Sequence, residues 1–206
     1  MSRTEEISSE VKAVNEAATE AGTRADEILE YAREQIEISV EHGWDGVGQS
    51  INIAGEALEK IAAELSGLDD AFESAASTLD EITEQMSRSE VAQHLSLSLT
   101  ALEGTQETLE NTVSLVDEAM QGAEQAEHEA LANRLQLLRE NVEGLFERLA
   151  QSRSDIEAEH EEAQNMGQGE GDETQRDQKP DQDRDRDGRD GRDQDDDQNE
   201  GRAPGN

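Results

Sequence analysis

The stretch of sequence that decides the fold is VGQSINIAGEALEKIAAELSGLDDAFESAASTLDEITEQM, residues 47–86. Apolar side chains recur along it at alternating steps of four and three residues, at Val47, Ile51, Ala54, Leu58, Ile61, Leu65, Leu68, Phe72, Ala75, Leu79, Ile82 and Met86. This is the period of a coiled-coil seam, the stripe along which one helix packs on another, and not the period of a β-strand. We therefore expect one long amphipathic helix here.

The same spacing occurs three more times outward from this stretch, within residues 7–32, 91–120 and 131–156. The last of these is rich in leucine, the first is rich in alanine, and no proline interrupts residues 1–163. We predict an all-α fold of elongated antiparallel helical hairpins. Side by side, two hairpins would form a coiled-coil-like four-helix bundle, whereas end to end, or paired between chains, they would form an extended or dimeric assembly, and the spacing does not decide between these. The seams are expected to pair within the chain or between chains, and their strongest residues are Leu58, Leu65, Leu145 and Leu149.

Turn signals divide the helical part into two segments. Gly43-Trp44-Asp45-Gly46 contains residues that tolerate turn geometry, so residues 1–86 are expected to form a first hairpin with its turn at 43–46. A capping-box sequence, Ser-x-x-Glu, opens a second helical segment over residues 87–163. Near residues 127–130 the seam slips by one position without a Gly or Pro, and this second segment is either another hairpin or one continuous helix.

An internal repeat is also indicated. Seven apolar residues lie 84 positions before seven others: Ile51, Ile53, Ala54, Leu58, Ile61, Ala62 and Leu65 precede Leu135, Leu137, Leu138, Val142, Leu145, Phe146 and Leu149. A duplicated hairpin would give this match, and heptad spacing shared by unrelated helices would give it as well. Both explanations are open at this point.

Residues 164–206 differ in composition from the rest of the chain. From residue 167 onward the only apolar side chain is Ala203, both prolines occur there, and Asp, Arg, Gln and Gly predominate. Such a segment cannot bury enough apolar surface to offset its conformational entropy. We therefore predict a disordered, charged C-terminal tail.

Asp183, Asp185 and Asp187 in this tail have the spacing of calcium ligands in an EF-hand loop, with Gly188 at the sixth place. The twelfth place is Gln194 and not the glutamate that completes such a loop. Low-complexity Asp-Arg-Gly sequence also generates this pattern by accident. Calcium at these three residues is a hypothesis only, and no other metal site and no cofactor are expected.

The formal net charge of −35 opposes binding to nucleic acid phosphates and to anionic lipid headgroups, so we expect no nucleic acid partner. No apolar run approaches the roughly 18 residues of a membrane span, and no membrane insertion is expected. The N-terminus lacks the pattern of a secretory signal peptide, which favours a cytoplasmic protein or, alternatively, export without a cleavable signal. The acidity itself is either functional or an adaptation to salt.

No pattern of catalytic residues emerges. The histidines are isolated, and no strand is predicted that could carry a glycine-rich phosphate loop. Adjacent carboxylates are frequent along the whole chain and therefore do not single out an acid–base pair. We predict a protein that is not an enzyme. His42 and His128 lie near two of the turn regions, where an imidazole can cap the preceding helix.

Trp44-Asp45-Gly46 is a Trp-any-Gly sequence at the turn between two long helical arms. In this respect residues 1–86 resemble the WXG100 family, ESAT-6-like proteins that are exported as helical hairpin dimers by specialised secretion systems. The resemblance implies that Trp44 and Gly46 contact a partner and contribute to an export signal. The family's second element, Tyr-x-x-x-Asp or Glu after the second helix, is not matched, because the only tyrosine is Tyr31 and Gln35 follows it at that spacing. An aromatic residue that simply fixes the hairpin loop is the structural alternative.

Three functions are compatible with these observations. We expect first a non-enzymatic helical interaction or scaffold protein that acts through its heptad seams, with another protein or a second copy of itself as the partner. The alternative is a WXG100-like substrate or partner of a specialised secretion system. A second alternative is an acidic decoy or nucleic-acid mimic that binds a basic partner, because the predicted helical part carries most of the negative charge.

Overall fold

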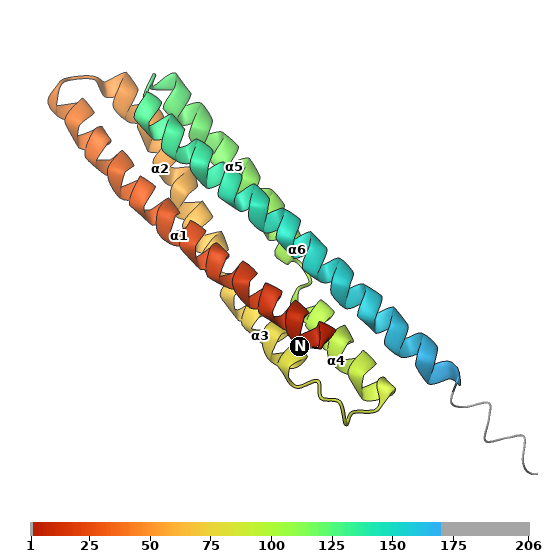
Figure 1. Cartoon of the computed structure of the whole chain (residues 1–206). Helices are drawn as coiled ribbons and strands as arrows, with labels where there is room; N and C mark the ends of the chain where they lie inside the picture. The colour runs from red at the N-terminus through yellow and green to blue at the C-terminus, as the bar shows by residue number, and fades with distance from the viewer. Residues whose placement is uncertain (1, 170–206) are drawn as a thin grey trace, which may run out of the picture.

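The computed structural model describes residues 2–169, and within them it contains α-helices and no β-strand, which confirms the all-α prediction (Figure 1). The helices are α1 (Arg3–Glu41), α2 (Asp45–Ser66), α3 (Asp69–Asp80), α4 (Arg88–Ala101), α5 (Thr105–Gln125) and α6 (Glu129–Gly169). With 39 and 41 residues, α1 and α6 each span roughly 60 Å. No helix in the described residues is long and apolar enough to cross a membrane.

The helices form four rods that lie side by side along the long axis of the molecule (Figure 1). α1 is the first rod, α2 and α3 follow each other along the second, α4 and α5 along the third, and α6 is the fourth. α1 packs against α2, α3 and α6, while α5 packs against α2 and α6, and α4 packs against α3 and α6. Consecutive rods run in opposite directions, so the chain is an up-and-down four-helix bundle, which is the side-by-side arrangement of the two predicted hairpins.

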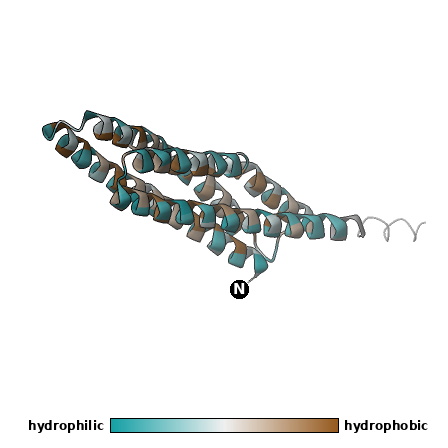
Figure 2. Cartoon of the chain, turned by 90° about the horizontal axis from the view of Figure 1, so that it is seen from above, coloured by the Kyte–Doolittle hydropathy of each residue, from teal (hydrophilic) through white to brown (hydrophobic). Residues whose placement is uncertain are grey.

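The core of the bundle consists mainly of alanine, leucine, isoleucine and valine, and apolar and polar segments alternate around each helix (Figure 2). Leu58, Leu65, Leu145 and Leu149 are at most 2% exposed and belong to this one core. A leucine buried so completely stabilises the fold by roughly 1.5–3 kcal/mol relative to an exposed one. The four seam leucines therefore hold the rods of a single chain together and are not available on its surface.

Small residues let the rods approach one another closely. Alanines such as Ala21 and Ala25 make up much of the α1 seam and are fully buried. At Gly122 of α5, an added Cβ atom would lie 2.8 Å from the Ser50 carbonyl oxygen and 3.0 Å from the Ala54 nitrogen, both in the backbone of α2. α5 therefore crosses α2 in near backbone contact, which a residue with a side chain would prevent.

The prediction of a single helix over residues 47–86 is wrong, because the helix is interrupted at Gly67. α2 ends just before this residue, which has weak helix propensity, and α3 begins two residues after it. The Phe72 N–H donates to the Leu68 carbonyl at 3.1 Å, which restarts the helix in the same direction. Leu68 and Phe72 are both buried, so the apolar seam continues across the break.

The second rod ends at Asp80, and residues 81–87 form the connection to the third. Ser87 caps α4 as expected: its Oγ accepts from the Glu90 N–H at 3.3 Å, and the Glu90 carboxylate accepts from the Ser87 N–H at 2.8 Å. Two hydrogen bonds to this carboxylate lower the pKa of Glu90: the larger effect comes from the Ser87 hydroxyl and the smaller one from the Ser87 N–H. The capping box therefore fixes where the third rod begins.

The end of α3 is tied to α1 through Asp80. Lys12 Nζ donates to one carboxylate oxygen at 2.6 Å, and Ser8 Oγ donates to the other at 2.5 Å. The Lys12 hydrogen bond, followed by that of Ser8, holds the pKa of the Asp80 carboxyl below its ordinary value. Because the Asp80 side chain is about half exposed, solvent screens this ion pair and its net contribution to stability is modest.

The third rod is also interrupted, between α4 and α5, where the sequence predicted one seam over residues 91–120. Gly104 takes a left-handed conformation with φ of 85°, which glycine adopts without steric cost. The Thr108 N–H donates to the Gly104 carbonyl at 3.0 Å, and α5 continues from there. Leu102 and Leu109 are fully buried on either side, so again the seam is continuous although the helix is not.

The 84-residue offset seen in the sequence recurs in the burial pattern. The members of each pair match: Ile51, Ala54, Leu58, Ile61 and Leu65 are buried like their counterparts, Ala62 and Phe146 are half-buried, and Ile53 and Leu137 are exposed. Gly43 and Glu127, which are also 84 positions apart, both have positive φ. A shared turn is not explained by heptad spacing, so these observations favour a duplicated hairpin. We call α1–α3 the first repeat and α4–α6 the second repeat.

The last helix is longer than predicted. α6 runs to Gly169, so residues 164–169 continue the helix and do not belong to a tail that begins at 164. The good helix formers Glu, Ala, Gln and Met occupy most of residues 157–166 and carry the helix beyond its last seam residue, whereas the glycines at 167 and 169 accompany its end. The rest of the predicted disordered tail, including the calcium hypothesis at Asp183, Asp185 and Asp187, lies outside the described residues.

Candidate interaction site

The connection between α1 and α2 is a tight turn closed by two backbone hydrogen bonds. The Gly43 N–H donates to the Val40 carbonyl at 3.0 Å, and the Trp44 N–H donates to the Ser39 carbonyl at 2.8 Å. This is the Schellman pattern, in which the residue after the helix is left-handed, and Gly43 has a φ of 74°. The chain therefore reverses abruptly, and α2 begins at Asp45.

Trp44 lies on the outside of this turn. Its indole ring stacks on the imidazole of His42, with 4.9 Å between the ring centroids and 30° between the planes. His42 Nδ1 lies 2.8 Å from the Ile38 carbonyl oxygen, which can only accept, so Nδ1 carries the proton. His42 thus caps α1 and supports Trp44 from one side, while Trp44 is 55% exposed.

Two further apolar residues are exposed near the end of α1 that leads to Trp44. They lie on either side of the buried Ser39, so they face different sides of the helix. Ile38 is 42% exposed and Val40 is 60% exposed, both near the C-terminal end of α1. The heptad spacing did not single them out, because they lie beyond the seam of residues 7–32. We call Ile38, Val40 and Trp44 the apolar end. The exposed acidic residues of the same region are Glu37, Glu41 and Asp45.

The connection between α5 and α6 lies at the same end of the bundle and has the same backbone pattern (Figure 1). The Glu127 N–H donates to the Glu124 carbonyl and the His128 N–H to the Ala123 carbonyl, each at 2.9 Å. Glu127 takes the left-handed place of Gly43, with a φ of 51°. A residue with a side chain pays roughly 1–2 kcal/mol for this conformation, so the turn holds strain that the first turn lacks.

His128 caps the start of α6 and not the end of α5. The Leu131 N–H donates to His128 Nδ1 at 3.2 Å, so Nδ1 is unprotonated and the proton lies on Nε2, which faces Gln35 Oε1 at 3.3 Å. The expectation that both histidines cap the preceding helix is therefore right for His42 and wrong for His128. The two rings carry their protons on different nitrogens because one faces a carbonyl and the other faces an N–H.

Tyr31 joins α1 to α6 beside this second turn. The His128 and Tyr31 rings are nearly perpendicular, with 5.8 Å between their centroids, and the Arg134 guanidinium lies 4.3 Å from the centre of the Tyr31 ring. A cation over an aromatic face is attracted by the ring's negative charge density. These contacts hold α6 against α1 about two helical turns before Ile38.

The structure separates the residues that the sequence singled out. Trp44 and Gly46 lie together on the surface, and no atom lies within 4 Å of the position that a Cβ on Gly46 would occupy. The seam leucines do not reach this surface, because all of them lie in the core. These are Leu58, Leu65, Leu145 and Leu149.

One group of carboxylates in the described residues is close enough to be considered for a metal ion. Asp69, Asp70 and Glu73 bring oxygen atoms within 4.8 Å of one another, and all are exposed. The Asn15 amide donates to Asp69 Oδ1 at 2.7 Å, so one of these oxygens already has a partner. Solvated acidic clusters of this kind are common on helix surfaces, and nothing else at this one indicates a metal ion.

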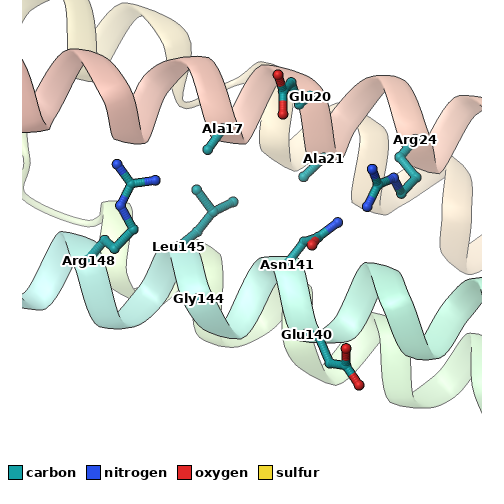
Figure 3. A pocket seen from close by; sticks show the side chains of 9 residues that line it. All are labelled: Ala17, Glu20, Ala21, Arg24, Glu140, Asn141, Gly144, Leu145 and Arg148. Atoms are coloured by element: carbon teal, nitrogen blue, oxygen red, sulfur yellow. The ribbon is translucent and has the colours of Figure 1, made fainter.

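A hollow of about 260 Å³ lies between α1 and α6 (Figure 3). Arg24 of α1 and Arg148 of α6 extend into it from opposite sides, and Gly144 leaves its floor open because it has no side chain. Arg148 Nε bonds to Glu10 Oε1 at 2.8 Å, which neutralises one of the two cations. One of its two arginines is thus paired across the two rods, and the hollow shows no group of polar side chains that converge on a ligand.

Comparisons with models of protein families, with curated proteins and with solved structures found no match to this chain. The likeness of residues 1–86 to the WXG100 family stays a prediction.

Proposed function

We propose that this chain is a non-enzymatic interaction protein that docks on another protein through the apolar end. The observation that carries the proposal is the exposure of Trp44, at 55%, on a turn that is closed by backbone hydrogen bonds. Ile38 and Val40, at 42% and 60%, are exposed on α1 just before this turn. Tryptophan is among the residues that most often dominate the binding energy of protein interfaces. Because the turn is already held in place, docking would cost little conformational entropy.

The expected partner is a different protein and not a second copy of this chain. The seams of the two repeats face each other inside one core, so each hairpin already has the cover that a separate hairpin would need from another molecule. Glu37, Glu41 and Asp45 border the apolar end, and two copies that met there would bring like charges together, which costs free energy. An apolar pocket bordered by Lys or Arg fits this surface better.

Site-specific photocrosslinking in the producing cells tests this proposal. A photoreactive amino acid in place of Trp44 should give one discrete adduct with a different protein, because this side chain enters the partner's pocket. Leu97 is a matched control, since it is apolar and 51% exposed but lies on α4, in the other half of the bundle. The absence of an adduct at position 44, the same adduct at position 97, or an adduct with the mass of two copies would each refute the proposal.

The second candidate is a WXG100-like substrate or partner of a specialised secretion system. It is supported by the exposed Trp44 at a hairpin turn, and by a second repeat that covers the first as a dimer partner would. Culture supernatant and cells are compared for the wild type and Trp44→Ala in a host that has the secretion machinery. Export that depends on Trp44 supports this candidate, and a wild-type chain that stays in the cytoplasm removes it.

A further inference from the structure

A groove with a volume of about 450 Å³ lies between α5 and α6, away from both turns. Its floor is formed by Val113 and Phe146, which are half-buried, and its rim by Glu110, Glu143 and Glu147. The chain has only two phenylalanines, and the other one is fully buried in the core. An aromatic side chain that remains partly open to solvent between three carboxylates is therefore unusual for this molecule.

Hydrogen bonds between α5 and α6 flank the groove on both sides. Arg139 Nε bonds to Asp117 Oδ1 at 2.8 Å on one side, and Arg153 Nη1 donates to Gln106 Oε1 at 3.4 Å on the other. Arg139 also bonds to Glu143 of its own helix at 2.8 Å. The other two rim glutamates have no ion pair with a basic residue in the described part of the chain. The middle of the groove therefore holds negative charge that a cation from outside would balance.

The corresponding face of the first repeat serves as an internal comparison. There Arg33 of α1 bonds to Glu59 of α2 at 2.7 Å, so a cation joins the two helices at a place where the second repeat has an acid. The first repeat also has alanine where the second has the groove's aromatic ring and one of its rim carboxylates. The first repeat thus has Arg33, Ala62 and Ala63 at the positions of Asp117, Phe146 and Glu147. Two copies of one fold differ here in the features that a binding groove requires.

We propose that the α5–α6 groove binds a cationic amphipathic helical segment of a partner protein. An apolar side chain of that segment lies on Phe146 and Val113, and lysine or arginine residues one helical turn to either side meet the rim glutamates. A basic segment without the apolar residue gains only solvent-screened ion pairs. An apolar segment without lysine or arginine leaves the negative charge of the rim glutamates unbalanced. The site is separate from the apolar end and does not depend on Trp44.

Binding of two synthetic peptides to the full-length chain tests the proposal. One peptide contains leucine and lysine at amphipathic helical spacing, and the other contains the same residues in scrambled order. We expect the amphipathic peptide to bind at least about tenfold more tightly in a fluorescence anisotropy titration. Equal affinity for both peptides would overturn the proposal, because general attraction to an acidic surface would then account for all of the binding.

Substitutions then locate the site. The triple variant Glu110→Gln, Glu143→Gln and Glu147→Gln keeps the size of the side chains and should weaken binding of the amphipathic peptide about tenfold or more. The matched control removes three charges from the corresponding face of the first repeat and should change the affinity by less than about twofold. An equal loss in both variants would overturn the proposal. The control substitutions are Asp26→Asn, Glu56→Gln and Glu59→Gln.

Two single substitutions separate the contribution of the floor from that of the apolar end. Phe146→Gln should also weaken binding about tenfold, since it removes the apolar floor and keeps the charge. Unchanged affinity in a Phe146→Gln variant with native circular dichroism would contradict the proposal. Trp44→Ala should leave the peptide affinity unchanged. Failure of the peptide to bind at the groove would therefore not contradict the function proposed for the apolar end. Failure of the crosslinking test at Trp44 would likewise not contradict binding at the groove.

Discussion

An added methyl group should stabilise the fold at one helical glycine, Gly144, and should not stabilise it at another, Gly122. Alanine is favoured over glycine inside a helix by about 1 kcal/mol, and this gain applies at both positions. At Gly144 no atom lies within 4 Å of the new Cβ, which would sit in the hollow between α1 and α6 (Figure 3). Gly144→Ala should therefore raise the free energy of unfolding by about 0.5–1 kcal/mol.

At Gly122 the same Cβ would lie 2.8 Å from the Ser50 carbonyl oxygen and 3.0 Å from the Ala54 nitrogen. Both are backbone atoms of α2 and cannot rotate away, so α5 has to move away from α2 to make room for the methyl group. Overpacking of this kind costs about 1–3 kcal/mol, which offsets or exceeds the helix-propensity gain. Gly122→Ala should thus be less stable than Gly144→Ala by about 1–3 kcal/mol, because the propensity term is common to both variants.

Urea unfolding followed by far-ultraviolet circular dichroism measures this difference. Both variants should keep the wild-type dependence of the unfolding free energy on urea, so that the midpoints can be compared directly. Equal midpoints for the two variants would refute the close packing of α2 on α5. They would mean that the rods are further apart than described, or that they move apart without cost.

Three further predictions concern local features. Glu127→Gly should raise the unfolding free energy by about 0.5–1 kcal/mol, because glycine adopts the left-handed conformation without steric cost, and an unchanged or lower midpoint would contradict this. Asp80→Asn should lower the unfolding free energy at neutral pH but not in strong acid. Lys12 holds the pKa of Asp80 below its ordinary value of 3.8. The stability that the Asp80 carboxylate contributes is therefore complete above that value and is lost as the pH falls through the lower folded-state pKa. Unfolding midpoints as a function of pH check this, and a difference that persists in acid would count against it. Heteronuclear NMR should find the proton on Nδ1 of His42 and on Nε2 of His128, and the same tautomer in both rings would disprove one of the two caps.

The heptad spacing predicted the four rods but not the ends of the helices, for a physical reason. Burial of an apolar stripe requires only that the rod keeps its direction, and Leu68 and Phe72 stay in the core across the break at Gly67. Glycine alone is a weak signal of a break, because Gly55 lies within α2 without interrupting it. The spacing therefore reports which residues face the core, and the helix ends depend on local backbone geometry.

The candidate site was only partly predictable for a related reason. Trp44 could be singled out because glycines flank it, and a glycine is what the left-handed turn position favours. The turn between α5 and α6 has no glycine to indicate it, because Glu127 takes the left-handed conformation in spite of its side chain. Ile38 and Val40 were missed because their exposure depends on where the neighbouring rods end, which the spacing along one helix does not report.

Trp44 is the only tryptophan of the chain, so its fluorescence reports directly on whether the apolar end is uncovered and available to another protein. Acrylamide quenching of the folded full-length chain is measured over a wide range of protein concentration and compared with quenching of the urea-unfolded chain. We expect a red-shifted emission, quenching at least about half as efficient as in the unfolded chain, and no dependence on protein concentration, because Trp44 is 55% exposed. A blue-shifted emission with strong protection, or protection that increases with protein concentration, would contradict the proposed role, because the chain or a second copy of it would then cover the apolar end.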